Sequence, residues 1–271
     1  MNNTVLEVKD LKCRFLIKNN FFKSNIYLEA INEVTFDIQK GETLGVVGES
    51  GCGKSTLCRT ITNLNNKSSG NIKWFNKDLD NYNAKELKSL RKRIQIIFQD
   101  PYGSLDPRMN IGNIIKEPVE IFYKGLSAVD KAFKVISVMD KVGLSEDLYN
   151  RYPHELSGGQ CQRVGIARAI INEPEVLICD EPVSSLDLSV QSQILDLLDE
   201  LKLNYNLTMV FVSHDLSVIK NISDNVIVMH EGKIIEKNNS KDLFSCPKEE
   251  YTKKLIKSVP SPIPIEKKHG N

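Results

Sequence analysis

"GESGCGKST", residues 48–56, is the stretch that decides the fold. It fits the pattern G-x-x-x-x-G-K-[ST], in which Gly48 is the first position and Ser55 the last. The run before it, "TLGVV" (43–47), predicts a buried parallel strand, and a helical pattern follows at 54–63. A glycine-rich loop between a strand and a helix turns its backbone N–H groups inward around a phosphate. We therefore expect this chain to bind a nucleoside triphosphate.

The side chains of this loop have distinct expected roles. Lys54 would reach the β- and γ-phosphate oxygens, and the Ser55 hydroxyl would ligate Mg²⁺. Because the loop has the required strand and helix on either side, a chance match to the pattern is disfavoured. The loop residues expected to bind the nucleotide are Gly48, Ser50, Gly51, Cys52, Gly53, Lys54, Ser55 and Thr56.

A second apolar run ends in two acids, in "EVLICDEP" (175–182). Asp180 and Glu181 would emerge at the C-terminal end of a buried strand, where ligands bind in open α/β sheets. Asp180 could hold Mg²⁺ through a water, and Glu181 is placed to act as the general base that polarises an attacking water. The alternative is an acid pair that merely caps the next element, which the presence of the phosphate loop disfavours.

Two further polar residues end predicted strands and fit hydrolysis rather than simple binding. Gln99, in "FQDP" (98–101), carries an amide that could touch the metal or the attacking water. His214, in "SHD" (213–215), carries an imidazole that could hydrogen-bond the γ-phosphate. A lone histidine or glutamine at a strand end is more often structural, but these two strands should lie beside the phosphate loop.

The rest of the chain alternates strands with helices. This alternation predicts an α/β fold with a parallel sheet covered on both faces. Short alternating runs in the first forty residues predict antiparallel strands with one solvated face. From 100 to 171 helical periodicity takes over, which predicts a helical insert of roughly seventy residues. Strands are expected at 94–98, 176–180, 208–213 and 225–229, and helices at 189–203, 215–221 and within 248–259, before the proline-rich end of the chain.

Another helix start occurs in "YPHELSGGQCQRVGIARAI" (152–170). Ser157 stands at an N-cap position and Gln160 three residues on, which is the spacing of a capping box. The free N–H groups and the dipole of such a helix start favour an anion. The chain thus has two candidate phosphate sites, about a hundred residues apart.

Composition narrows the class of protein. At 271 residues, with 41% hydrophobic and 26% charged residues, the chain is typical of a soluble globular protein. The net charge of +1 gives no reason to expect nucleic acid as a partner. No signal peptide opens the chain and no apolar run is long enough to span a membrane. The six cysteines show no metal-ligand spacing, which favours reduced, mostly buried thiols.

Six motifs in this order, "GESGCGKST", "FQDP", "LSGGQCQR", "LICDEP", "SSLD" and "SHD", resemble the ATP-binding subunits of ABC transporters over residues 5 to 238. The resemblance implies an ATPase with ATP and Mg²⁺ as ligands. It implies a P-loop NTPase (RecA-like) core with an N-terminal antiparallel β subdomain and an inserted α-helical subdomain. The domains expected are an ATP-binding domain at 1–238, with its core at 1–99 and 172–238 and its helical subdomain at about 100–171, and a tail at 239–271.

The same resemblance implies the use of the second helix start. In this family two subunits dimerise head to tail, and the signature helix of one covers the nucleotide bound by the other. Ser157 and Gly159 would then donate to the partner's γ-phosphate, in a signature that also includes Gly158 and Gln160. Phe15 would stack on adenine, Gln99 would couple to the membrane subunits, and Asp187 would signal across the dimer.

The sequence resembles most the oligopeptide and dipeptide importer branch, and within it the F-type subunit. The resemblance implies a D-type partner in a heterodimer, two transmembrane permease subunits and, indirectly, an extracytoplasmic peptide-binding protein, at the cytoplasmic face of the membrane. The segment from Gln99 to Asn113 is the expected docking surface for a coupling helix of the membrane subunits. The tail reads "CPKEEYT" where "HPYT" is more typical of this branch. Some relatives carry several tail cysteines for an iron–sulphur cluster, but Cys246 is the single cysteine of this tail, so we expect no cluster.

Three alternatives stay open. The chain could be a family member that works on ribosomes or DNA, but it lacks the tandem ATPase units or long coiled coil of those relatives. It could bind ATP without hydrolysing it, but Glu181, His214 and "LSGGQ" are all present. It could serve an importer of another solute, such as nickel or a glutathione-like peptide, because the ATPase does not touch the cargo.

Overall fold

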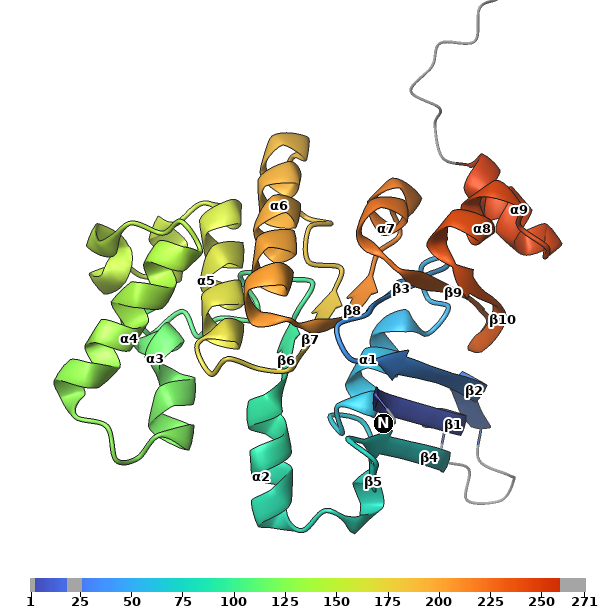
Figure 1. Cartoon of the computed structure of the whole chain (residues 1–271), viewed down its shortest axis with the longest axis horizontal. Coiled ribbons are helices and arrows are strands. Elements are labelled where there is room, and N and C mark those ends of the chain that lie inside the picture. The colour runs from blue at the N-terminus through green and yellow to red at the C-terminus, as the bar shows by residue number, and fades with distance from the viewer. Residues whose placement is uncertain (1–2, 19–25, 259–271) are drawn as a thin grey trace, which may run out of the picture.

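The computed structural model describes residues 3–18 and 26–258 and contains two sheets, shown in Figure 1. The smaller sheet is antiparallel, in the order β2-β1-β4-β5. Its long strands follow the alternating pattern near the N-terminus, so the predicted antiparallel strands are confirmed. The strands are β1 (Thr4–Lys18), β2 (Ile26–Gln39), β4 (Ser69–Trp74) and β5 (Lys77–Asp78).

The larger sheet has the order β10-β9-β3-β8-β7-β6. Every neighbouring pair is parallel except β9 and β10, which are antiparallel. This confirms the predicted α/β fold, although β10 had no counterpart among the expected strands. The strands are β3 (Thr43–Val47), β6 (Ile94–Ile97), β7 (Val176–Asp180), β8 (Thr208–Val212), β9 (Asn225–His230) and β10 (Lys233–Asn239).

The helices match the predicted ones to within about two residues where a helix was expected. Helix α2 was not expected, because its sequence "AKELKSLRKR" is strongly charged and buries only Leu90. A capping box between Asn83 and Glu86 starts it. The helices are α1 (Lys54–Ile61), α2 (Ala84–Arg93), α3 (Ile111–Phe122), α4 (Ala128–Lys141), α5 (Gly158–Ile170), α6 (Leu188–Tyr205), α7 (Leu216–Ile222), α8 (Ser240–Ser245) and α9 (Glu250–Lys257).

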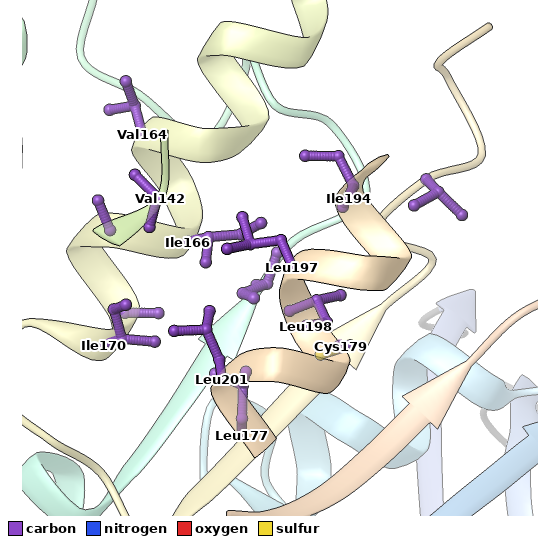
Figure 2. Packing of buried hydrophobic residues seen from close by; sticks show 14 of the residues in the cluster. Val142, Val164, Ile166, Ile170, Leu177, Cys179, Ile194, Leu197, Leu198 and Leu201 are labelled. Atoms are coloured by element: carbon purple, nitrogen blue, oxygen red, sulfur yellow. The ribbon is translucent and has the colours of Figure 1, made fainter. Parts of the chain in front are cut away.

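The larger sheet separates two hydrophobic cores. Successive side chains of a strand point to opposite faces, so Val176 and Ile178 of β7 enter one core while Leu177 and Cys179 enter the other. The first core lies between this sheet, α1 and the antiparallel sheet. The second lies under α5 and α6, where Figure 2 shows side chains of both helices, Leu198 among them, directed at one another and at β7. Burial on both faces explains why these strands are continuously apolar.

The inserted region is helical, as predicted. No strand lies between residues 98 and 175, and α3, α4 and α5 form a layer at one end of the molecule in Figure 1. At the other end, α8 and α9 lie beside β9 and β10. The C-terminal segment from 259 to 271, whose prolines and charges predict an extended or frayed end, lies outside the described residues.

Among the helices of the described part of the chain, none combines the length and the apolar character needed to cross a membrane.

Candidate nucleotide-binding site

A pocket of about 800 Å³ opens where the phosphate loop meets the C-terminal ends of the parallel strands. It gathers residues from β1, the loop and α1, and the ends of β6, β7 and β8, because parallel strands place their C-terminal ends at one edge of a sheet. The predicted site residues that line it are Phe15, Ser50, Gly51, Gly53, Lys54, Ser55, Thr56, Gln99, Glu181 and His214.

Two glycines give the loop its shape. Gly53 has φ +108°, a left-handed conformation that side chains disfavour, and a Cβ there would collide with the carbonyl oxygen of Ala30. A Cβ on Gly48 would collide with the carbonyl oxygen of Met229 in β9. Gly48 therefore sits against the sheet and does not line the pocket, and its expected contact with the nucleotide stays a prediction.

Lys54 is 4% exposed and crosses beneath the loop. Its Nζ donates to the carbonyl oxygens of Gly48 at 2.8 Å and Glu49 at 2.9 Å. Cys52 is also buried, with Sγ 3.9 Å from that Nζ, and burial raises the pKa of its thiol. The Cys52 side chain therefore supports the loop from behind and does not line the pocket, and its expected contact with the nucleotide stays a prediction.

Ser55 and Asp180 are joined across the sheet edge. The Ser55 hydroxyl donates to Oδ1 of Asp180 at 2.8 Å. Asp180 is 2% exposed, and burial raises the pKa of its carboxyl group although the Ser55 hydrogen bond lowers it. The structure thus brings together the two residues predicted to face Mg²⁺, with Asp180 behind Ser55 and outside the pocket lining.

Glu181 meets both predicted polar strand-end residues. Gln99 donates through Nε2 to Glu181 Oε2 at 2.8 Å, and His214 Nδ1 lies 3.4 Å from the same oxygen. Glu181 has φ +48°, a left-handed conformation that costs energy for a residue with a side chain, and its backbone N–H donates to Val212 at the end of β8. The three residues therefore form one cluster at the open end of the phosphate loop.

The pocket continues onto the antiparallel sheet. Phe15 of β1 lies opposite Leu28 of β2 in the register of the two strands, and both side chains are exposed at 41% and 54%. An exposed aromatic beside an open pocket suits the stacking role expected of Phe15. Five residues that line the pocket were not predicted from the sequence. Three lie on β2, which pairs with β1, and two lie in the turn after β9, so predicting this pairing and this turn could have found them. They are Leu28, Glu29, Ala30, Glu231 and Gly232.

The second helix start lies apart from this pocket. Ser157 caps α5 as predicted, with Oγ accepting from the Gln160 N–H at 3.3 Å and Gln160 Oε1 accepting from the Ser157 N–H at 2.9 Å. The residues 157–160 do not line the pocket, so this helix start is not part of the same chain's phosphate site. A Cβ on Gly159 would meet Cγ1 of Val190 in α6, so close packing gives one reason for glycine at this position.

Asp187, the predicted signalling residue, also lies outside the pocket. It is exposed and caps α6, where Oδ1 accepts from the Val190 N–H at 3.0 Å and from the Ser189 hydroxyl at 2.6 Å. These hydrogen bonds lower the pKa of its carboxyl group, so Asp187 is ionised at neutral pH. Asp187 lies at the start of α6, as does Val190, the residue that packs against Gly159 of the signature.

Residues 31–184, which contain the phosphate loop, Gln99 and the two strand-end acids, match the family model described as ABC transporter. The chain belongs to the ABC transporter family. It is an ATP-binding subunit of that family and hydrolyses ATP. The pocket between the phosphate loop and the strand ends collects the lysine, the aromatic residue and Glu181, and the other expected acid, Asp180, lies directly behind its Ser55.

Relatives of this ABC subunit match it almost end to end. The oligopeptide transport ATP-binding protein OppF of Haemophilus influenzae is 52% identical, and that of Salmonella typhimurium 49%, each over 96% of this chain and 79% of the relative. The dipeptide transport ATP-binding protein DppF of Haemophilus influenzae is 45% identical over the same shares.

Solved structures share the fold. The dimeric ATP-binding cassette MJ0796 in a post-hydrolysis state, bound to ADP and Pi, has a TM-score of 0.77 and 27% identity, covering 87% of this chain and 98% of that one. CbiO1 from Clostridium perfringens, described as part of the ABC transporter complex cbiONQ, has a TM-score of 0.75 and 31% identity, covering 90% and 92%. These structures agree with the predicted arrangement of core, antiparallel sheet and helical insert.

Proposed function

We propose that this subunit powers the import of oligopeptides or dipeptides as an F-type subunit. The observation that carries the proposal is identity of about half of all residues to subunits named for oligopeptide transport, over nearly the whole chain. The three residues expected to act in hydrolysis, Gln99, Glu181 and His214, line one pocket, which supports hydrolysis over the alternative of a silent ATP-binding partner.

The chemistry follows from the cluster around Glu181. Glu181 takes a proton from the attacking water as the water oxygen bonds to the γ-phosphorus and the bond to the ADP oxygen breaks. Gln99 donates to Oε2 of Glu181, so that hydrogen bond must be released before this oxygen takes the proton. His214, exposed beside the same oxygen, is placed to hydrogen-bond the γ-phosphate. Phe15 stacks on the adenine and Lys54 binds the phosphates.

Mg²⁺ fits the residues present. Its preferred ligands are oxygens, and it keeps several waters while binding through one or two protein groups and substrate phosphates. The Ser55 hydroxyl and the Gln99 amide oxygen line the pocket, and the Asp180 carboxylate lies directly behind Ser55. We propose that these three residues hold the ion, which would neutralise charge on the phosphates. The described residues include no cluster of three His, Cys, Asp or Glu side chains that would hold a metal by themselves.

A second ATP-binding subunit of the D type would complete the site. Ser157 is exposed at a capped helix start that does not reach the pocket of its own chain. In a head-to-tail heterodimer it would face the partner's γ-phosphate, together with Gly158, Gly159 and Gln160. Asp187 lies one packing layer away, through Val190, which supports its role in signalling across the dimer.

The transmembrane subunits would dock beside β6. An apolar groove of about 180 Å³ lies between the end of α1, α2 and β6, and it is lined by Leu64, Leu87 and Ile96 among others. Leu64 is 53% exposed, and Gln99 of the catalytic cluster follows three residues after Ile96. We propose that a permease segment binds this groove and the neighbouring segment 99–113, and that β6 links it to Gln99. The subunit would then be held at the cytoplasmic face of the membrane through protein contacts.

We also propose the domain division 1–238 and 239–271, with the core at 1–99 and 172–238 and the helical subdomain at about 100–171. The layer formed by α3, α4 and α5 supports the helical subdomain at about 100–171. The boundary between 238 and 239 falls at the end of β10, before α8 and α9.

Uptake measured in a strain that lacks this subunit tests the substrate. With the wild-type chain restored, we expect uptake of a labelled tri- or tetrapeptide to return, and with Glu181→Gln we expect it to stay absent. Uptake of nickel and of glutathione should be the same in all three strains. If nickel or glutathione uptake followed the subunit instead, the peptide assignment would be wrong, and if no solute uptake changed, a role outside transport would be favoured.

A further inference from the structure

The C-terminal helix touches the phosphate loop. Tyr251, in the first turn of α9, accepts a hydrogen bond through its hydroxyl from the backbone N–H of Glu49 at 3.2 Å. The two residues are 202 positions apart, and Glu49 is the second residue of the loop motif. Figure 1 shows α9 at the same end of the molecule as β9 and β10, and the loop is seated against β9, where a Cβ on Gly48 would meet the carbonyl oxygen of Met229.

The ring of Tyr251 is held in place by the sheet. It packs on the imidazole of His230, the last residue of β9, with ring centroids 4.1 Å apart. β9 pairs with β3, the strand that leads into the loop, so the tyrosine rests on the same framework as the loop. Its hydroxyl therefore has a fixed position relative to Glu49.

The start of α9 is also held in place. Glu236 of β10 is 8% exposed, and its carboxylate accepts from the backbone N–H groups of Lys248 at 2.9 Å and Glu249 at 3.1 Å. Thr252, next to the tyrosine, is fully buried. A carboxylate at a helix N-terminus stabilises the helix through these free N–H groups and the helix dipole. Glu236 thus holds the two residues that precede α9, and the hydrogen bond to Glu49 shows that Tyr251, in the next turn, is directed at the loop.

The hydrogen bond gains importance when nucleotide binds. Lys54 Nζ holds the carbonyl oxygens of Gly48 and Glu49. When Lys54 turns to the phosphates, these contacts are weakened, because an ammonium group has only three donors. The Glu49 N–H bond to Tyr251 does not involve Lys54 and can persist. We propose that Tyr251 is a positioning residue, through which the C-terminal helix holds the phosphate loop in the shape that binds nucleotide.

The proposal rests on ATP binding at the phosphate loop and is independent of the solute carried. Tyr251→Phe removes the hydroxyl and keeps the ring on His230. Loss of one such hydrogen bond should weaken binding about two- to tenfold. Tyr205→Phe is the matched control, because its hydroxyl also accepts one hydrogen bond, from Lys141 at 2.7 Å, on a different part of the surface.

The test measures the dissociation constants of ATP and ADP for the full chain by calorimetry, and the hydrogen exchange of the Glu49 amide by NMR. We expect Tyr251→Phe to weaken the binding of both ATP and ADP and to speed hydrogen exchange of the Glu49 amide. Its unfolding midpoint should be close to that of Tyr205→Phe. Tyr205→Phe should bind both nucleotides as the wild type does. Unchanged affinities in Tyr251→Phe would overturn the proposal, as would equal weakening in both variants. If the wild type bound no nucleotide, the ATP-binding function itself would be overturned.

Discussion

Gln99 and Glu181 lie 82 residues apart and are joined by a 2.8 Å hydrogen bond from Nε2 to Oε2. The bond connects the strand that borders the apolar groove with the residue placed to act as general base. While Gln99 donates to Oε2, that oxygen is less able to take a proton from water. Movement of Gln99 is therefore a physical route by which hydrolysis could be controlled, if a membrane subunit docks at the groove as proposed.

Glu181→Gln should lower ATP turnover by about 10²- to 10⁴-fold, because an amide cannot accept the proton from water. ATP binding should remain, so ATP should trap a stable dimer that size-exclusion chromatography detects. Glu231→Gln is the matched control, since Glu231 lines the same pocket and has a similar left-handed backbone, with φ +46° against +48° for Glu181. Equal turnover in Glu181→Gln and the wild type would exclude Glu181 as the base.

Lys54→Ala should abolish tight ATP binding. The ammonium group is the only charged donor that lies under the loop within the described site, and it also holds the carbonyl oxygens of Gly48 and Glu49. Calorimetric titration with ATP measures the loss, and circular dichroism establishes that the variant is folded. Binding at wild-type strength would show that the loop backbone alone holds the phosphates.

Ser157→Arg should spoil the ATP site of the partner subunit and spare the phosphate loop of its own chain. The reason is that Ser157 is exposed and does not line the pocket of its own chain. Photo-crosslinking of labelled ATP to each subunit of the heterodimer would show which site is empty, and Lys54→Ala should give the reverse pattern. Loss of label from the chain that carries Ser157→Arg would contradict the trans arrangement.

Asp180→Asn should stabilise the nucleotide-free chain at neutral pH while impairing hydrolysis. Burial raises the pKa of Asp180, so the folded state favours the neutral acid, and stability is lost as pH rises through that raised pKa. Asparagine removes this cost and can still accept from Ser55. A gain of about 1 kcal/mol would raise the Tm by about 2–4 °C.

Calorimetric melting at several pH values checks this. The difference in Tm between Asp180→Asn and the wild type should be present at pH 7 and should vanish below the ordinary carboxyl pKa, about 3.9, where Asp180 is neutral in both states. A difference that persisted in acid would point to a packing effect instead of the charge.

Leu64→Asp should weaken attachment to the transmembrane subunits, because it places a charge on the rim of the apolar groove. The measurement is co-sedimentation with vesicles that contain the permeases, and protein-free liposomes should not retain the wild type. Leu203→Asp is the control, since Leu203 is more exposed than Leu64, at 81% against 53%, and lies outside the groove. Equal attachment of both variants and the wild type would exclude the groove as the docking surface.

The sequence by itself determined the parallel strands of the larger sheet, the phosphate loop and the capped signature helix. These features depend on short-range rules: continuous apolar runs for doubly covered strands, glycines at left-handed positions, and capping residues three apart. Strand-end residues such as Gln99 and Glu181 could be named for the same reason, because parallel strands end at one edge of the sheet. The strongly charged helix α2 was missed, since its formation depends on its cap and on one buried leucine.

Only the tertiary structure decided which of these residues touch. It placed Cys52 and Gly48 beneath the loop instead of in the pocket, and Leu28 opposite Phe15. It also brought Tyr251 to Glu49, from a tail whose sequence carries no signal of the phosphate loop. Such contacts join segments far apart in the chain, and their geometry is set by strand register and by packing across the sheet, which local sequence patterns do not encode.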